Sequence, residues 1–141
     1  MLAVDQKTLL SASLRHQEDA EYLLAGSPDQ SWHLAGYAVE CIRKACLSVD
    51  TYRKVLSHEL GEDADELLEI LLALDAHSSR LHLQGWCEDG STLAKWRATH
   101  RYDSRNEHAA DATALVRETG LLHDRTMTAL WLAEPFDLES L

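Results

Sequence analysis

The segment from Ser27 to Val49 reads SPDQSWHLAGYAVECIRKACLSV, and it decides how the rest of the chain is interpreted. Ser27 suits a helix N-cap, Pro28 the first helical position and Gln30 the reciprocal position of a capping box. Small and apolar residues then recur at helical spacing and form one broad face: Leu34, Ala35, Ala38, Cys41, Ile42, Ala45, Cys46, Ser48 and Val49. A face this broad is typical of the central helix of a bundle.

Helical spacing continues on both sides of this segment. It predicts long helices over Asp5–Ala25, Asp63–Leu83 and Ser104–Leu132, and shorter helical turns over Tyr52–Leu56 and Leu93–Arg97. Alternation typical of strands is absent from the sequence. The predicted fold is therefore all-α: an up-and-down four-helix bundle with a short extra helical turn, formed by a single domain spanning residues 1–141.

Local residues set the predicted ends of these helices. Asp5 suits the cap of the first helix, and Gly26 suits its end. Ser104 and Glu107 have the spacing of a capping box at the start of the last helix. Gly120 is expected to interrupt and bend that helix.

The charge balance restricts the partners of this chain. Thirteen Lys and Arg face 24 Asp and Glu, so the formal net charge is −11. Such a surface repels nucleic acid and anionic membranes, and any contact with RNA must come from a local basic site or from an assembled surface. No apolar run approaches the roughly 18 residues of a membrane span, so we expect no membrane partner.

Cysteine usage points to a reducing compartment. The chain has an odd number of cysteines, Cys41, Cys46 and Cys87, and no recognisable secretory leader. We therefore expect a cytoplasmic protein in which these cysteines are small buried residues and form no disulfide.

A polar stripe runs along the central helix. His33, Tyr37, Glu40 and Lys44 have a spacing that puts them on one helical face, and Glu40 precedes Lys44 by four residues, the favourable order for an ion pair. One interpretation is a structural polar network that holds the helix in register. The other is part of a surface that binds a ligand or partner.

The same helix resembles a known family. His33–Leu47, with Gly-Tyr, then Glu, then Lys four residues later and small or apolar residues after it, resembles the second-helix signature of HEPN domains. Trp96 followed by Arg101 and Tyr102 is similar to the Trp…Arg-Tyr segment that precedes the last long helix of small prokaryotic members. His58–Leu60 is similar to their short His-x-Leu element.

The resemblance implies a helical bundle that is usually a homodimer. It implies RNA as the substrate of some members, non-catalytic binding in others, and pairing of many small members with a nucleotidyltransferase-type antitoxin. We therefore expect a metal-independent endoribonuclease of a toxin–antitoxin or defence system. The alternative is a non-catalytic HEPN dimer that binds a nucleotide or a nucleotidyltransferase-type partner.

The resemblance also implies functional residues. Ribonuclease members share an Arg and, a few residues later, a His near the start of the last helix. In this chain the pair is Arg101 and His108, with six residues between them. The further candidate binding residues are Tyr37, Glu40, Lys44, Tyr102 and Arg105.

The chemistry of this pair is reasonable on its own terms. The free amides at the start of a helix attract phosphate. His108 could take the proton of a ribose 2′-hydroxyl, and Arg101 could stabilise the charge on phosphorus. The opposing interpretation is that Arg101 pairs with Glu40 or another carboxylate and that His108 is an ordinary surface residue.

No metal or cofactor is expected. His100, Glu107 and His108 could cluster, but the sequence contains no HExxH or CxxC spacing and no Gly-rich phosphate loop.

Overall fold

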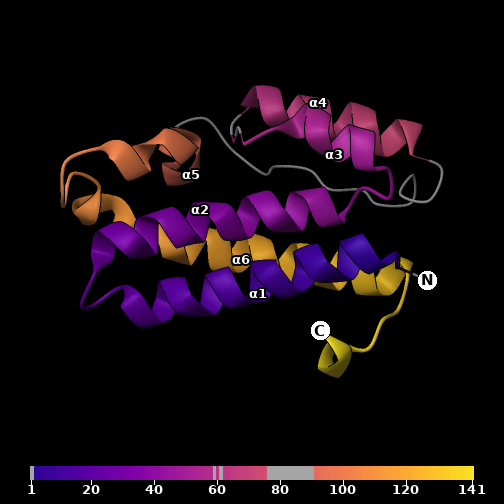
Figure 1. Ribbon diagram of the computed structural model, residues 1–141, viewed down its shortest axis with the longest axis horizontal. Coiled ribbons are helices and arrows are strands. Elements are labelled where there is room, and N and C mark those ends of the chain that lie inside the picture. The colour runs from indigo at the N-terminus through magenta and orange to yellow at the C-terminus, as the bar shows by residue number, and fades with distance from the viewer. Residues whose placement is uncertain (1, 59, 61, 76–90) are drawn as a thin grey trace.

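The computed structural model describes residues 2–58, 60, 62–75 and 91–141, and every regular element within these ranges is helical. This confirms the all-α class. The elements are α1 (Val4–Leu23), α2 (Pro28–Ala45), α3 (Asp50–Leu56), α4 (Glu62–Leu74), α5 (Thr92–Lys95), the 3-10 helix η1 (Ala98–Tyr102), α6 (Ala109–Ala133) and the 3-10 helix η2 (Leu138–Ser140) (Figure 1). No helix in the described part of the chain is long and apolar enough to cross a membrane.

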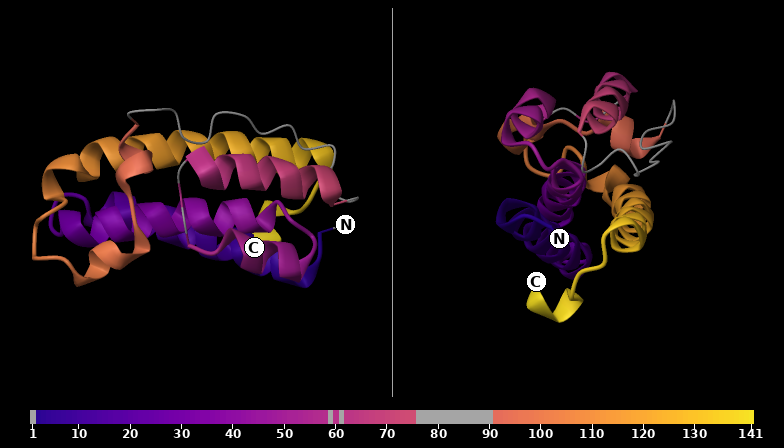
Figure 2. Two further views of the ribbon diagram at one scale, coloured as in Figure 1. Left: turned by 90° about the horizontal axis from the view of Figure 1, so that it is seen from above. Right: turned by 90° about the vertical axis from the view of Figure 1, so that its right-hand side faces the viewer.

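The long helices α1, α2 and α6 lie side by side, and α2 contacts both of the others (Figures 1 and 2). Helices α3 and α4 lie beside the C-terminal half of α2, while α5 and η1 lie at its N-terminal half. The C-terminal segment returns to α1, where Ser11 Oγ donates to the carbonyl of Leu141 at 2.9 Å. The C-terminal half of α2 therefore lies beside the helices that follow it in the sequence, and its N-terminal half beside segments more than 40 residues away.

The direction of α4 departs from the predicted up-and-down order. Arg43 of α2 pairs with Asp65 near the start of α4, and the backbone N–H of Ser48 donates to Asp75, just after α4, at 2.6 Å. These two contacts advance along both helices together, so α4 runs parallel to α2. The short helix α3 runs back antiparallel to α2, the direction that the sequence had predicted for the long third helix.

Most predicted bounds are close to the observed ones. Helix α2 begins at Pro28 as expected, and the short turns at residues 52–56 and 93–97 appear as α3 and α5. Helix α1 is capped at Ala3 rather than Asp5, and the Ala3 N–H donates to Gln6 Oε1 at 3.1 Å. The predicted third helix is too long, because α4 ends at Leu74; residues 76–83 lie outside the described residues.

The last helix begins later than predicted. Helix α6 starts at Ala109 with His108 as its N-cap, whereas the sequence indicated a start near Ser104. Asn106 has a φ of 65°, a left-handed conformation that no α-helix accommodates. One of the two hydrogen bonds expected for the capping box is present: the Ser104 N–H donates to Glu107 Oε2 at 3.2 Å. Helix α6 also continues without interruption through Gly120.

The cysteines behave as small apolar residues where the structure describes them. Cys46 is buried and its thiol donates to the carbonyl of Ile42 at 3.3 Å. Cys41 is half-buried, and burial raises the pKa of its thiol to about 11. Cys87 lies outside the described residues.

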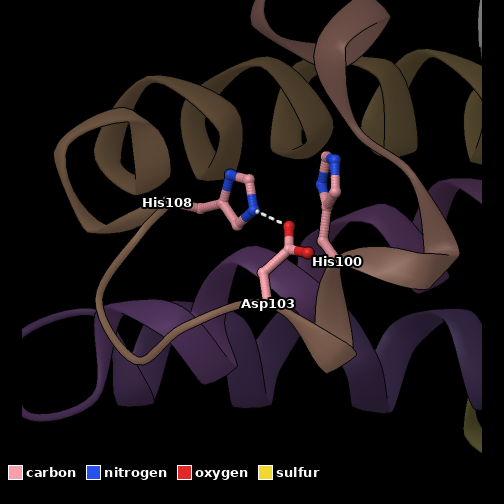
Figure 3. A group of neighbouring side chains, drawn as sticks. All are labelled: His100, Asp103 and His108. Atoms are coloured by element: carbon pink, nitrogen blue, oxygen red, sulfur yellow. Dashed lines mark hydrogen bonds and ion pairs between the residues drawn. The ribbon is translucent and has the colours of Figure 1, made fainter.

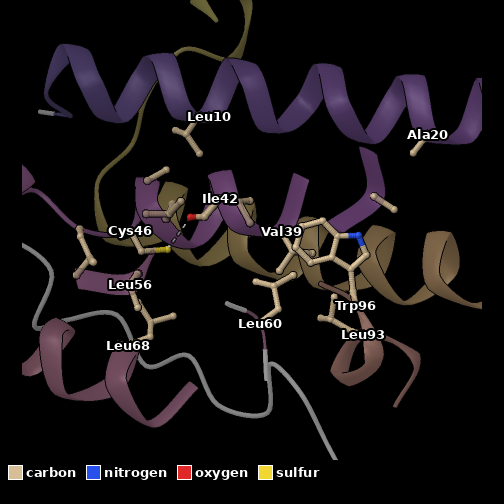
Figure 4. Close-up of a cluster of buried hydrophobic side chains, with 14 of the residues drawn as sticks. Leu10, Ala20, Val39, Ile42, Cys46, Leu56, Leu60, Leu68, Leu93 and Trp96 are labelled. Atoms are coloured by element: carbon tan, nitrogen blue, oxygen red, sulfur yellow. Dashed lines mark hydrogen bonds between the residues drawn. The ribbon is translucent and has the colours of Figure 1, made fainter. Parts of the chain in front are cut away.

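The core is centred on α2, and Trp96 is its largest contribution from outside the long helices (Figure 4). The Trp96 side chain is fully buried, and its Nε1 donates to the carbonyl of Trp32 at 3.0 Å. Its ring lies directly over Gly36, where a Cβ atom would overlap the indole. Tyr37 contacts the same ring edge-on, with centroids 5.2 Å apart. Gly36 is therefore the residue that lets the segment after α5 dock on α2.

Gly36→Ala tests this docking. In an open helical site, Ala stabilises by about 1 kcal/mol relative to Gly. At residue 36 we expect the opposite, a loss of about 3 kcal/mol in the free energy of unfolding, because neither the rigid indole nor the helix backbone can yield cheaply. Urea denaturation measures the difference.

The matched control is Gly26→Ala, because a Cβ there meets no atom within 4 Å. We expect the free energy of unfolding of this variant to stay within about 0.5 kcal/mol of the parent. Equal stability of the two variants would show that the contact between Trp96 and Gly36 is loose.

Candidate functional site

The polar stripe of α2 is a network of hydrogen-bonded ion pairs. Glu40 Oε1 accepts from Lys44 Nζ at 2.8 Å and lies 2.6 Å from His58 Nδ1. Glu40 is only 8% exposed, so its carboxylate depends on these partners. The network joins α2 to His58, two residues after the end of α3, which favours the structural interpretation of Glu40 and Lys44.

Arg101 lies elsewhere, at the end of η1. Its Nη2 donates to the Tyr102 hydroxyl at 2.8 Å, and its guanidinium carbon lies 4.8 Å from the centroid of the Tyr102 ring. The hydrogen bond to Tyr102 is the main cause that raises the pKa of Arg101, and the Tyr37 side chain adds to it. Both Arg101 and Tyr102 are exposed, and the expected alternative pairing of Arg101 with Glu40 is not observed.

His108 occupies the N-cap of α6 and is held on two sides. Its Nε2 lies 2.7 Å from Asp103 Oδ2 (Figure 3). Its ring stacks on His100 with centroids 4.0 Å apart, and on Trp32 with centroids 5.0 Å apart. The side chain keeps 18% exposure. His108 is thus a positioned imidazole with a carboxylate partner, and not the freely exposed residue of the opposing interpretation.

His100 connects this arrangement to the buried Trp32. Its Nδ1 accepts from Trp32 Nε1 at 3.0 Å and from the Arg97 N–H at 3.2 Å. A nitrogen that accepts hydrogen bonds carries no proton, so the ring proton of neutral His100 is on Nε2. Burial is the first cause that lowers the pKa of His100, and the charge of His108 is the second.

His100, Asp103 and His108 could also be considered as metal ligands. One donor atom from each lies within 4.8 Å of the others. However, Nδ1 of His100 is occupied by two N–H donors and Nε2 carries the proton, so an ion could use His100 only by breaking this arrangement. The donor set therefore fits a hydrogen-bonded cluster better than a metal centre.

A cleft of about 390 Å³ lies beside this cluster, between the start of α2 and the loop that follows η1. Its lining residues are Gly26, Ser27, Pro28, Asp29, Gln30, His33, Arg101, Asp103, Arg105 and Asn106. The Asn106 N–H donates to Asp29, which joins the two walls. Within the described part of the chain, Arg105 has no hydrogen bond or ion pair. The cleft therefore holds two arginines, of which Arg105 has no charged partner among the described residues, beside the carboxylates of Asp29 and Asp103.

The structure brings together only some of the predicted residues. Arg101 and Arg105 line the cleft, and His108 reaches it through Asp103. Glu40 belongs to its own network, and Lys44 lines a different cavity of about 330 Å³ beside Arg53. The predicted binding set of Tyr37, Glu40, Lys44, Tyr102 and Arg105 is thus divided between separate parts of the molecule.

Sequence reasoning overlooked Asp103 and Trp32. Asp103 lies between two histidines in a short irregular segment, and this spacing of His100, Asp103 and His108 was the available signal. Trp32 had no comparable signal, because its role depends on a partner 68 positions away.

Comparisons with family models, curated proteins and solved structures give no significant match.

Lys44→Met tests the structural interpretation of the stripe. The methionine keeps the apolar stem but leaves the buried carboxylate of Glu40 with one partner fewer. We expect the free energy of unfolding to fall by about 2 kcal/mol, measured by urea denaturation.

Lys54→Met is the matched control, since Lys54 makes the same i,i+4 type of pair with Asp50 but its side chain is 75% exposed. That variant should lose no more than about 0.5 kcal/mol. If Lys44→Met matched it in stability and instead weakened binding of RNA, the stripe would be a ligand surface.

Proposed function

We propose that this chain is a HEPN-type helical domain and that the cleft between α2 and the loop after η1 cleaves RNA without a metal ion. The observation that carries the proposal is that Arg101, Arg105 and the His108–Asp103 pair meet at one cleft. A four-helix, HEPN-like arrangement is part of the same proposal, with α1, α2, α4 and α6 as the long helices.

The residues at the cleft support transesterification of RNA as the proposed reaction. Asp103 binds Nε2 of His108, which leaves Nδ1 as the proton acceptor of the neutral ring. His108 takes the proton of the 2′-hydroxyl, the 2′-oxygen bonds to phosphorus, and the bond from phosphorus to the 5′-oxygen breaks. The leaving 5′-oxygen takes a proton from water and His108 later returns its proton to solvent, so the products are a 2′,3′-cyclic phosphate and a 5′-hydroxyl. Arg101 and Arg105 stabilise the charge on the phosphoryl oxygens.

The acidic surface is consistent with a local site for RNA. A net charge of −11 opposes long-range attraction of a polyanion, so affinity must come from the cleft itself. The proposal includes a homodimer and a nucleotidyltransferase-type antitoxin as partners. Exposed apolar side chains on α6, Leu121 and Leu132, at 62% and 70% exposure, are available for such contacts.

A second candidate is the non-catalytic HEPN dimer that binds a nucleotide or a nucleotidyltransferase-type partner. The observation in its favour is the bond between Arg101 and the Tyr102 hydroxyl, which gives this pair a conformational role. Light scattering distinguishes a dimer from a monomer in either case, and a monomer would exclude a cleft composed of two subunits.

Cleavage of single-stranded RNA in the presence of a chelator tests the first candidate. We expect the parent protein to release 2′,3′-cyclic phosphate ends, and Arg101→Ala and His108→Ala each to lower the rate at least about 100-fold. Gel analysis of end-labelled RNA measures both. Activity that disappears with the chelator and returns with zinc would overturn metal independence.

The control is Arg125→Ala, an exposed arginine on α6 away from the cleft. Its rate should equal that of the parent. Parent protein that binds RNA but never cleaves it would favour the second candidate.

A further inference from the structure

His33 is the one histidine among the residues that line the cleft. It lies on α2, on the wall opposite the loop that carries Arg101 and Arg105. Nδ1 of His33 is buried and has no hydrogen-bond partner. Nε2 is not among the buried atoms that lack a partner, and no hydrogen bond joins it to another described residue, so Nε2 is the nitrogen that reaches the cleft.

The burial of Nδ1 indicates which nitrogen carries the proton. A buried N–H without an acceptor is rarer and costlier than a buried acceptor without a donor. Neutral His33 therefore keeps its lone pair on the buried Nδ1 and its proton on Nε2. The ring then presents an N–H to the cleft while carrying no charge.

The surroundings of His33 are consistent with a neutral ring. Burial is the largest influence on its pKa and lowers it; Asp29 and Asp103 act in the opposite direction, while His108 and Arg101 lower it further. A neutral donor can approach phosphate at the same time as the two arginines without adding to their mutual repulsion.

We propose that His33 binds the phosphate of RNA in this cleft as a neutral hydrogen-bond donor, through Nε2–H, from the wall opposite Arg101. The proposal rests on the proposed function for the identity of the ligand, but it assigns a residue that neither the Arg–His pair nor the polar stripe explained. His33 therefore has a different role from Glu40 and Lys44, which share its helical face but belong to the structural network.

The test uses three substitutions at one position and a probe that cannot be cleaved. A 2′-O-methyl RNA oligonucleotide lacks the attacking hydroxyl, so fluorescence polarisation reports binding alone. His33→Gln puts an amide N–H near the place of Nε2, His33→Asn puts one near Nδ1, and His33→Ala removes the donor. We expect His33→Ala and His33→Asn to bind about tenfold more weakly, and His33→Gln to stay within about threefold of the parent.

A measurement on the unmodified protein complements the variants. Nitrogen-15 NMR of the His33 ring should show the proton on Nε2 at neutral pH, and the Nε2 signal should shift when the 2′-O-methyl RNA is added. A proton on Nδ1, or a His33→Gln variant as weak as His33→Ala, would overturn the proposal. So would a parent protein that does not bind the probe.

Failure of the proposed function has a different signature. The parent protein could bind the 2′-O-methyl RNA in a His33-dependent manner and yet fail to cleave unmodified RNA. That result would contradict the ribonuclease activity but support the role of His33 in binding. If the parent cleaves RNA, and all three variants bind and cleave it as the parent does, the ribonuclease proposal stands and the proposed role of His33 is wrong.

Discussion

Trp96 can lie against α2 only because residue 36 has no Cβ. This close approach fixes where the chain returns to the bundle after α4, since the indole is fully buried and its N–H is bonded to the carbonyl of Trp32. The residues that follow Trp96 are then held at the N-terminal half of α2, where η1 contacts that helix. The positions of Arg101, Asp103, Arg105 and His108, which follow Trp96 in the chain, depend on this docking.

The site is continuous with the core. Trp32 is almost completely buried, yet its Nε1 bonds to His100 and its face stacks on His108. Asp103 then connects His108 to the cleft. An imidazole held by packing on one face and by a carboxylate at one nitrogen has few orientations available, which is the preorganisation that acid–base chemistry requires. Stability and function are therefore expected to be coupled around Trp32.

Two parts of the sequence resembled functional motifs, the Glu40–Lys44 pair and the segment with Arg101, and they lie in different parts of the structure. Glu40 bonds both to Lys44 on α2 and to His58 beyond α3, and this gives the most distinctive part of the helix a structural explanation. Arg101 lies at a cleft whose other cation, Arg105, has no partner among the described residues. A periodic pattern identifies residues on one face of a helix, but it does not say which parts of that face meet the same neighbour.

The all-α class, the start of α2 and the presence of α3 and α5 follow from the sequence alone, because helical spacing, Pro28 and turn residues act over a few positions. The Glu40–Lys44 pair is local for the same reason. Packing alone decided the parallel course of α4, the left-handed Asn106 that delays α6, and the meeting of His33 with Arg101 and Arg105. These features depend on contacts between segments tens of residues apart, and one sequence carries no local signal for such contacts.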